Sequence, residues 1–118
     1  MAIASTNPAT GELIQSFDAL TDEQIEEKLA TAAEAFRSYR STSFAERAGW
    51  LRAAADILDA EAEGLGRLAT LEMGKTLASA VAEVGKCAKG CRWYAEHTEA
   101  VLADQPHPLD GARVFTRY

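Results

Sequence analysis

Short apolar stretches on either side of a turn cluster open the chain. The segment "NPATG" at 7–11 combines Pro8, which presets φ, with Gly11, which can adopt a positive φ. The flanking stretches "AIAS" and "ELIQSF" are short and rich enough in apolar residues to pair. We therefore predict a β-hairpin over residues 1–18. Because an isolated hairpin is only marginally stable in water, it must rest on another part of the molecule.

Apolar residues recur at helical spacing over most of positions 21–103. Thr21 with Gln24, and Ser43 with Glu46, match capping boxes, in which the first residue and the third helical residue bond each other's backbone. An apolar stripe follows each box, which predicts two amphipathic helices. The stripes are Ile25, Leu29, Ala32 and Phe36 after the first box, and Leu51, Ala54, Ala55, Leu58 and Ala62 after the second.

Two further helices and a strand are predicted in the second half of the chain. Gly64 and Gly66 weaken a helix and predict a break before "RLATLEMG". The longest helix is expected to begin near Leu77, to carry a seam with steps of four and three, and to end before Pro106 and Pro108. The seam comprises Leu77, Val81, Val84, Ala88, Cys91, Ala95, Thr98 and Leu102.

The stretch "ARVFTRY" at 112–118 is rich in strand-forming residues and predicts a terminal strand. The predicted fold class is therefore mainly α, with an N-terminal β-hairpin, about four helices and a terminal strand.

Composition narrows the possible partners. The 118 residues suffice for one domain, and 47% hydrophobic with 25% charged residues is typical of a globular protein. A net charge of −6 disfavours binding to nucleic acid. No apolar run approaches the roughly 20 residues that span a bilayer, and "MAIASTNPATGE" lacks the pattern of a signal peptide. We expect a cytoplasmic protein with reduced cysteines, without a nucleic-acid or membrane partner.

The stretch "ATLEMGKT" at 69–76 fits a loose phosphate-loop pattern. A functional loop of this kind follows a strand, is rich in glycine, and aims several backbone N–H groups at the phosphates. Here a helical apolar pattern precedes the match, Gly74 is its only glycine, and Glu72 would place a negative charge beside the phosphates. The alternative is a helix end, with Gly74 in the left-handed conformation and Lys75 favourable at the negative end of the helix dipole. We predict the helix end and no nucleotide site.

Other groups of reactive side chains also favour structural roles. Cys87, Cys91, His97 and His107 do not have the spacing of a zinc site, and Cys91 falls within the apolar seam. Glu96, His97 and Glu99 could suggest acid–base chemistry, but adjacent helical residues do not face each other. Lys86, Lys89 and Arg92 are interpreted as the solvent face of an amphipathic helix. We therefore predict no catalytic, cofactor-binding or metal-binding residue in this chain.

The order of several motifs resembles the N-terminal quarter of the NAD(P)-dependent aldehyde dehydrogenase superfamily. The motifs are "NPATGE", "TAAEAFRSYR", "RAGWLRAAADIL", "LATLEMGKTLASAVAEV" and "CRWYAEH", and the match extends over nearly all of the chain. "EMGK" followed by "AEV" and "WYAEH" looks most like the succinate-semialdehyde dehydrogenase branch. The resemblance implies that residues 1–118 form the N-terminal helical portion of the cofactor-binding domain, with a hairpin at 1–18, helices at 21–103 and the start of an oligomerisation strand at 112–118.

The resemblance also implies which functional parts lie elsewhere. In this family a cysteine attacks the aldehyde, hydride passes to NAD or NADP, and the thioester is hydrolysed. The motifs around Cys87 and Cys91 do not match those of the nucleophile, and no glutamate here matches the general base. The resemblance therefore implies a structural segment of a homo-oligomeric enzyme that acts on a small aldehyde. Trp93 and Tyr94 could line an entrance or simply pack. The alternative function is a stand-alone helical interaction module without enzymatic activity.

Overall fold

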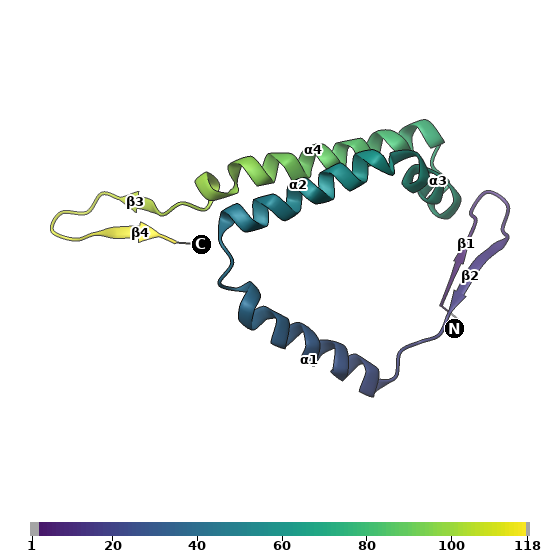
Figure 1. Cartoon of the computed structure of the whole chain (residues 1–118), viewed down its shortest axis with the longest axis horizontal. Coiled ribbons are helices and arrows are strands. Elements are labelled where there is room, and N and C mark those ends of the chain that lie inside the picture. Colours follow the sequence, from purple (N-terminus) through teal and green to yellow (C-terminus); the bar gives the residue numbers. More distant parts are fainter. Residues whose placement is uncertain (1–2, 118) are drawn as a thin grey trace.

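The computed structural model describes residues 3–117, which form helices and two small sheets (Figure 1). The helices are α1 (Asp22–Tyr39), α2 (Phe44–Ala60), α3 (Ala62–Met73) and α4 (Leu77–Val101). The strands are β1 (Ile3–Thr6), β2 (Leu13–Phe17), β3 (Gln105–His107) and β4 (Val114–Thr116). The predicted class, mainly α with an N-terminal hairpin, is confirmed. Residues 1, 2 and 118 of the predicted spans lie outside the described residues.

The N-terminal hairpin forms as predicted. β1 and β2 are antiparallel, with Ile3 opposite Phe17 and an irregular register between Ser5 and Thr6. Gly11 has φ 77°, the left-handed conformation that glycine adopts without strain. The hairpin contacts α3 through a hydrogen bond of 2.8 Å from the Ser5 hydroxyl to a carboxylate oxygen of Glu72. The expected support for the hairpin is therefore the end of α3.

Both predicted capping boxes are present. The Thr21 hydroxyl accepts from the N–H of Gln24, whose side chain accepts from the N–H of Thr21 at 3.0 Å. Ser43 and Glu46 make the same exchange at the start of α2, with 2.8 Å from the Ser43 N–H to the carboxylate. These bonds satisfy backbone donors that a helix start leaves free, and they hold the pKa of Glu46 below its ordinary value.

Helices α2, α3 and α4 pack together and form the core of the described residues (Figure 1). The predicted faces of α2 and α4 turn inward, and the buried apolar side chains are alanines: Ala55, Ala80 and Ala88. Small side chains let the helix axes approach closely, and they leave the larger residues at the rim of the interface. An ion-pair cluster links two of these helices at the surface, because Arg92 of α4 bonds Asp56 at 2.8 Å and Asp59 at 2.7 Å on α2.

The break between α2 and α3 lies at Glu61, earlier than predicted. The prediction from Gly64 and Gly66 was wrong, since both lie inside α3. Gly66 is buried where α3 meets α4, and a Cβ placed on it would lie 2.6 Å from Cγ2 of Val81. Gly66 therefore serves close helix packing rather than helix termination.

The C-terminal strand has a partner that the sequence analysis missed. β4 pairs antiparallel with β3, placing Pro106 opposite Phe115. Pro106 was interpreted only as a helix stop, but proline is also tolerated in an edge strand, where its missing N–H is not needed. The Arg117 guanidinium holds both carboxylate oxygens of Asp104, at 2.8 and 2.6 Å, and thereby closes the hairpin base.

The molecule is open in shape. Its radius of gyration is 20.8 Å, whereas a compact domain of this length has about 13 Å. Its accessible surface is 9513 Å², about half as much again as the roughly 6,200 Å² expected for a compact protein of this mass. Figure 1 shows α1 standing apart from α2 and α4, and α1 has no buried residue. Apolar faces therefore lie uncovered in the described residues.

Candidate functional site

The phosphate-loop candidate is a helix end. Gly74 terminates α3 with φ 70°, and its N–H donates to the carbonyl of Thr70 at 3.0 Å. The Gly74 N–H, which a phosphate loop would direct at its ligand, is thus already bonded to a carbonyl of α3. A Cβ on Gly74 would lie 3.0 Å from Pro8 of the N-terminal turn, so glycine also allows the hairpin to approach. The predicted left-handed stop at Gly74 is confirmed.

The polar residues around Gly74 also have structural partners. Glu72 accepts from Ser5 of the hairpin, and Lys75 forms an ion pair with Glu83 in the second turn of α4. The Thr76 hydroxyl caps the first turn of α4. The "EMGKT" sequence therefore joins three elements: it ends α3, starts α4 and holds the hairpin against their junction.

We expect no magnesium-dependent ATP binding at Lys75, because a helix rather than a strand precedes Gly74 and the ammonium already pairs with Glu83. Equilibrium dialysis with labelled ATP should give no saturable binding, and Lys75→Ala should match the unchanged chain. Lys89→Ala is the control for loss of one positive charge elsewhere. Saturable binding that Lys75→Ala abolishes and Lys89→Ala retains would contradict the helix-end assignment.

The candidate metal ligands lie in different settings. Cys87 is exposed, Cys91 is half-buried in the α2–α4 seam, and His107 lies on β3, where its Nε2 is 2.9 Å from the Thr116 hydroxyl. Across residues 3–117 no three His, Cys, Asp or Glu side chains gather in a way that could hold a metal ion. The absence of a metal site stays a prediction.

Aromatic residues form an exposed stack near the end of α4. The His97 ring stacks on Trp93 with centroids 4.6 Å apart and planes 10° from parallel, and its Nδ1 lies 2.8 Å from the Trp93 carbonyl oxygen. Tyr94 meets Trp93 edge to face at 5.1 Å. Trp93 remains 48% exposed and Tyr94 59%. His97 thus contacts a residue of its own helix. Trp93 and Tyr94 still expose part of their rings to solvent.

Arg92 was interpreted, with Lys86 and Lys89, as part of the solvent face of α4, but its side chain has a partner on another helix. Lys86 and Lys89 are exposed, whereas the Arg92 guanidinium turns to α2 and bridges Asp56 and Asp59. Hydrogen bonds to Asp56 and Asp59 raise the pKa of Arg92 above its ordinary value. Arg92 therefore lies at the surface but also links α4 to α2, a role that the sequence interpretation did not include. The sequence contains one indication of this contact: Asp56 and Asp59 are three residues apart and therefore lie on one face of α2.

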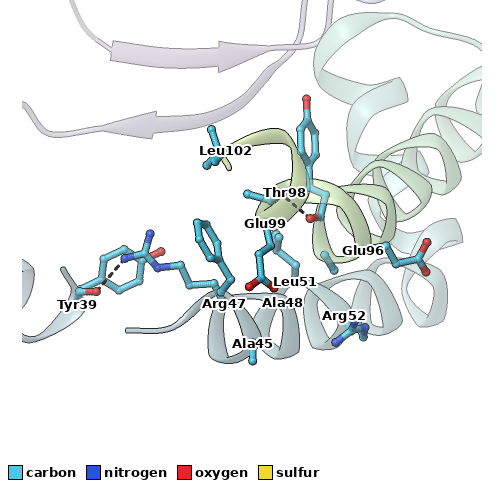
Figure 2. A pocket seen from close by; sticks show the side chains of 13 residues that line it. Tyr39, Ala45, Arg47, Ala48, Leu51, Arg52, Glu96, Thr98, Glu99 and Leu102 are labelled. Carbon is cyan, nitrogen blue, oxygen red and sulfur yellow. Dashed lines mark hydrogen bonds between the residues drawn. The ribbon is translucent and has the colours of Figure 1, made fainter. Parts of the chain in front are cut away.

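A cleft of about 560 Å³ lies between the start of α2 and the end of α4 (Figure 2). The elements that line it are the end of α1, the first turns of α2 and the last turns of α4. Its polar lining includes Arg47, Arg52, Glu96, Thr98 and Glu99. The sequence does not predict this cleft, because it depends on how the start of α2 packs beside the end of α4.

Two polar groups that line the cleft, those of Thr98 and Arg47, are engaged in local hydrogen bonds. The Thr98 hydroxyl donates to the Tyr94 carbonyl at 2.6 Å, within its own helix. Figure 2 shows the Glu99 carboxylate directed toward α2 and that of Glu96 directed away from it. Arg47 bonds the turn before α2, with 2.8 Å from its Nε to the Thr42 hydroxyl. The absence of a catalytic arrangement in the cleft stays a prediction.

No helix among the described residues combines the length and the apolar character needed to cross a lipid bilayer.

The family is established by comparison with known proteins. The model of the aldehyde dehydrogenase family matches residues 1–118. The chain therefore belongs to the aldehyde dehydrogenase family, as the motif order implied.

Two relatives are similar along the chain. Succinate-semialdehyde dehydrogenase (NADP+) 1 of Mycobacterium tuberculosis strain H37Rv is 54% identical over 114 residues, covering 97% of this chain and 24% of its own length. The succinate-semialdehyde dehydrogenase (NADP+) of Mycobacterium avium strain 104 is 49% identical over 122 residues, covering 100% and 26%. The chain thus spans about a quarter of the length of these curated relatives.

Solved structures share its arrangement of elements. Succinic semialdehyde dehydrogenase from Streptococcus pyogenes, in complex with NADP+, superimposes with a TM-score of 0.88 at 27% identity, covering 97% of this chain and 25% of that one. Succinate-semialdehyde dehydrogenase from Burkholderia pseudomallei gives 0.82 at 27% identity, covering 98% and 24%. Because almost the whole chain superimposes, its open shape matches part of a larger fold.

Proposed function

We propose that this chain is the N-terminal part of an NAD(P)+-dependent aldehyde dehydrogenase that oxidises succinate semialdehyde to succinate. The observation that carries the proposal is the identity of 54% along 97% of the chain with a succinate-semialdehyde dehydrogenase. Structural relatives named for the same substrate support it. The cofactor is NAD or NADP, and the protein is expected to be a cytoplasmic homo-oligomer.

Within that enzyme, residues 1–118 have a structural role. They are the N-terminal helical portion of the cofactor-binding domain, and their uncovered faces pack against the rest of the enzyme. Catalytic and cofactor-binding residues are supplied by the remaining sequence. This division of roles fits the open shape of the described residues. In the proposed enzyme, residues 112–118 begin an oligomerisation strand.

The test is to express the natural reading frame extended beyond Tyr118 and to follow NAD(P)H formation by absorbance. Succinate semialdehyde should be oxidised with a higher kcat/KM than butanal, which has the same chain length but no terminal carboxylate. NAD+ and NADP+ are compared under the same conditions. An extended protein that reduces neither cofactor with any aldehyde would refute the activity, and equal kcat/KM for the two aldehydes would refute the substrate class.

A further inference from the structure

The turn between β3 and β4 contains the one aspartate of the sequence that is followed by glycine, Asp110 before Gly111. Both residues are exposed, and Figure 1 shows their turn at the far end of the hairpin, away from the helices. A backbone bond of 3.4 Å from the Ala112 N–H to the Leu109 carbonyl closes the turn. The strand pairing stops before this turn. Asp110 and Gly111 are therefore accessible and weakly held.

The reactive groups of these two residues have no partner. Among residues 3–117, no hydrogen bond engages the Gly111 N–H or the Asp110 carboxylate. Gly111 has φ 80°, a left-handed conformation that glycine adopts without strain. Nothing lies within 4 Å of the position that a Cβ would occupy on Gly111. The neighbouring carboxyl group can thus approach the Gly111 nitrogen with no side chain in the way.

We propose that Asp110 is a site of spontaneous isomerisation, at which aspartate is converted through a cyclic succinimide into isoaspartate. The Gly111 nitrogen attacks Cγ of the protonated carboxyl group, a new N–Cγ bond replaces a C–OH bond, and the hydroxyl leaves with the amide proton as water. Water then adds to the main-chain carbonyl carbon of Asp110 and breaks its bond to the Gly111 nitrogen. One water is released and one is consumed, and no atom is oxidised or reduced. This chemistry is independent of the proposed dehydrogenase function, because it uses only the chain and water.

The fold protects most of the other aspartates from the same reaction. Three of them lie in helices, whose hydrogen-bonded backbone is rigid: Asp22, Asp56 and Asp59. Asp104 is held by the Arg117 guanidinium at 2.8 and 2.6 Å. Asp18 precedes Ala19, whose methyl group shields the peptide nitrogen. Asp110 therefore combines an unpaired carboxylate, a weakly held backbone and an unshielded nitrogen.

Isomerisation changes the connection that sets the register of β3 and β4. In isoaspartate the main chain runs through Cβ and Cγ, so the turn gains one backbone atom. Turn type and loop length fix the register of a hairpin. The lengthened turn no longer supports the pairing of His107 with Val114. Asp110 is thus a slow, age-dependent switch in this hairpin.

Ageing of the 118-residue chain at neutral pH and physiological temperature tests the site. Peptide-resolved mass spectrometry with electron-transfer fragmentation distinguishes isoaspartate from aspartate at each position. We expect isoaspartate to accumulate at Asp110 at least about tenfold faster than at any other aspartate, because local opening or a shielding methyl group slows the others. Gly111→Ala should slow the reaction several-fold, since its methyl group shields the nitrogen. Equal accumulation at Asp110 and Asp18, or a rate that Gly111→Ala leaves unchanged, would overturn the site.

The Gln105→Gly variant separates the effect of sequence from that of structure. It places a glycine directly after Asp104, so the same dipeptide lies beside the Arg117 ion pair and in a paired strand. Isoaspartate should form at Asp104 of this variant at least about tenfold more slowly than at Asp110, since the ion pair and strand must open first. In urea the two rates should converge. Equal rates in the folded variant would overturn the structural assignment.

Nuclear magnetic resonance tests the change of register. In the isomerised fraction, separated by chromatography, the cross-strand contact between His107 and Val114 should be lost, whereas the resonances of α2 and α4 should not shift. The matched control is Asp110→Glu, which keeps the charge but does not form the five-membered ring, and ageing should leave its hairpin unchanged. Retention of the contact in the isomerised fraction would overturn the switch.

Discussion

The 118-residue chain is expected to show no measurable oxidation of an aldehyde with NAD+ or NADP+. Its rate should lie at least about 10³-fold below that of the extended polypeptide. A reactive thiolate needs a cationic or helix-terminal setting, and its addition product needs an oxyanion site; one oxyanion donor alone contributes about 10²–10³ in rate. Cys87 lies in the middle of α4, where no helix start can stabilise a thiolate. Cys91 is half-buried and also lies within α4, away from its first turn. NAD(P)H formation, measured with succinate semialdehyde, should equal the protein-free blank.

The cysteine variants make this expectation decisive. Cys87→Ser and Cys91→Ser should leave the extended polypeptide active, because the proposed division of roles places the nucleophile in the remaining sequence. Any turnover by the 118-residue chain that disappears with Cys87→Ser or Cys91→Ser would refute the structural role assigned to this segment. Loss of activity in the extended polypeptide with a correctly folded Cys87→Ser variant would place the nucleophile here and overturn the division of roles.

The elements that sequence predicts well are those whose signals are local. A capping box satisfies donors within four residues, so Thr21 and Ser43 mark the starts of α1 and α2 without knowledge of the rest. The seam of α4 follows from its own periodicity, and Gly74 ends α3 by a conformation that glycine alone adopts readily. The helix-end interpretation of "EMGKT" succeeded for the same reason.

The features that sequence could not predict depend on contacts between distant segments. Gly66 looks like a helix breaker until Val81 of the next helix is placed against it. Pro106 looks like a stop until β4 folds back beside it. The roles of Arg92 and Arg47 depend on the position of α2 relative to α4 and α1. In each case the local preference of the residue was assigned correctly, but a contact with a distant segment determines its role in the fold.

Gly66 and Gly64 are expected to respond to alanine with opposite signs. Both lie inside α3, where alanine favours a helix by about 0.5–1 kcal/mol over glycine. Gly64 has nothing within 4 Å of an added Cβ, so Gly64→Ala should raise the free energy of unfolding by about that amount. At Gly66 the added Cβ meets Val81, 2.6 Å from Cγ2 and 3.1 Å from its backbone nitrogen. Overpacking of this kind costs about 1–3 kcal/mol, so Gly66→Ala should lower the free energy of unfolding by about 1–2 kcal/mol despite its helical gain. Urea unfolding followed by circular dichroism measures both.

A double variant separates the two parts of the clash at Gly66. Val81→Ala removes Cγ2 but leaves the Val81 backbone, which lies 3.1 and 3.3 Å from the added Cβ. Gly66→Ala should therefore cost less in a Val81→Ala background than in the unchanged chain, with a residual cost because the backbone cannot retract as a side chain can. Since the two positions are in contact, their effects should not add. If Gly66→Ala stabilises the chain as much as Gly64→Ala does, or costs the same with and without Val81, then α3 and α4 do not approach as closely as the buried glycine requires.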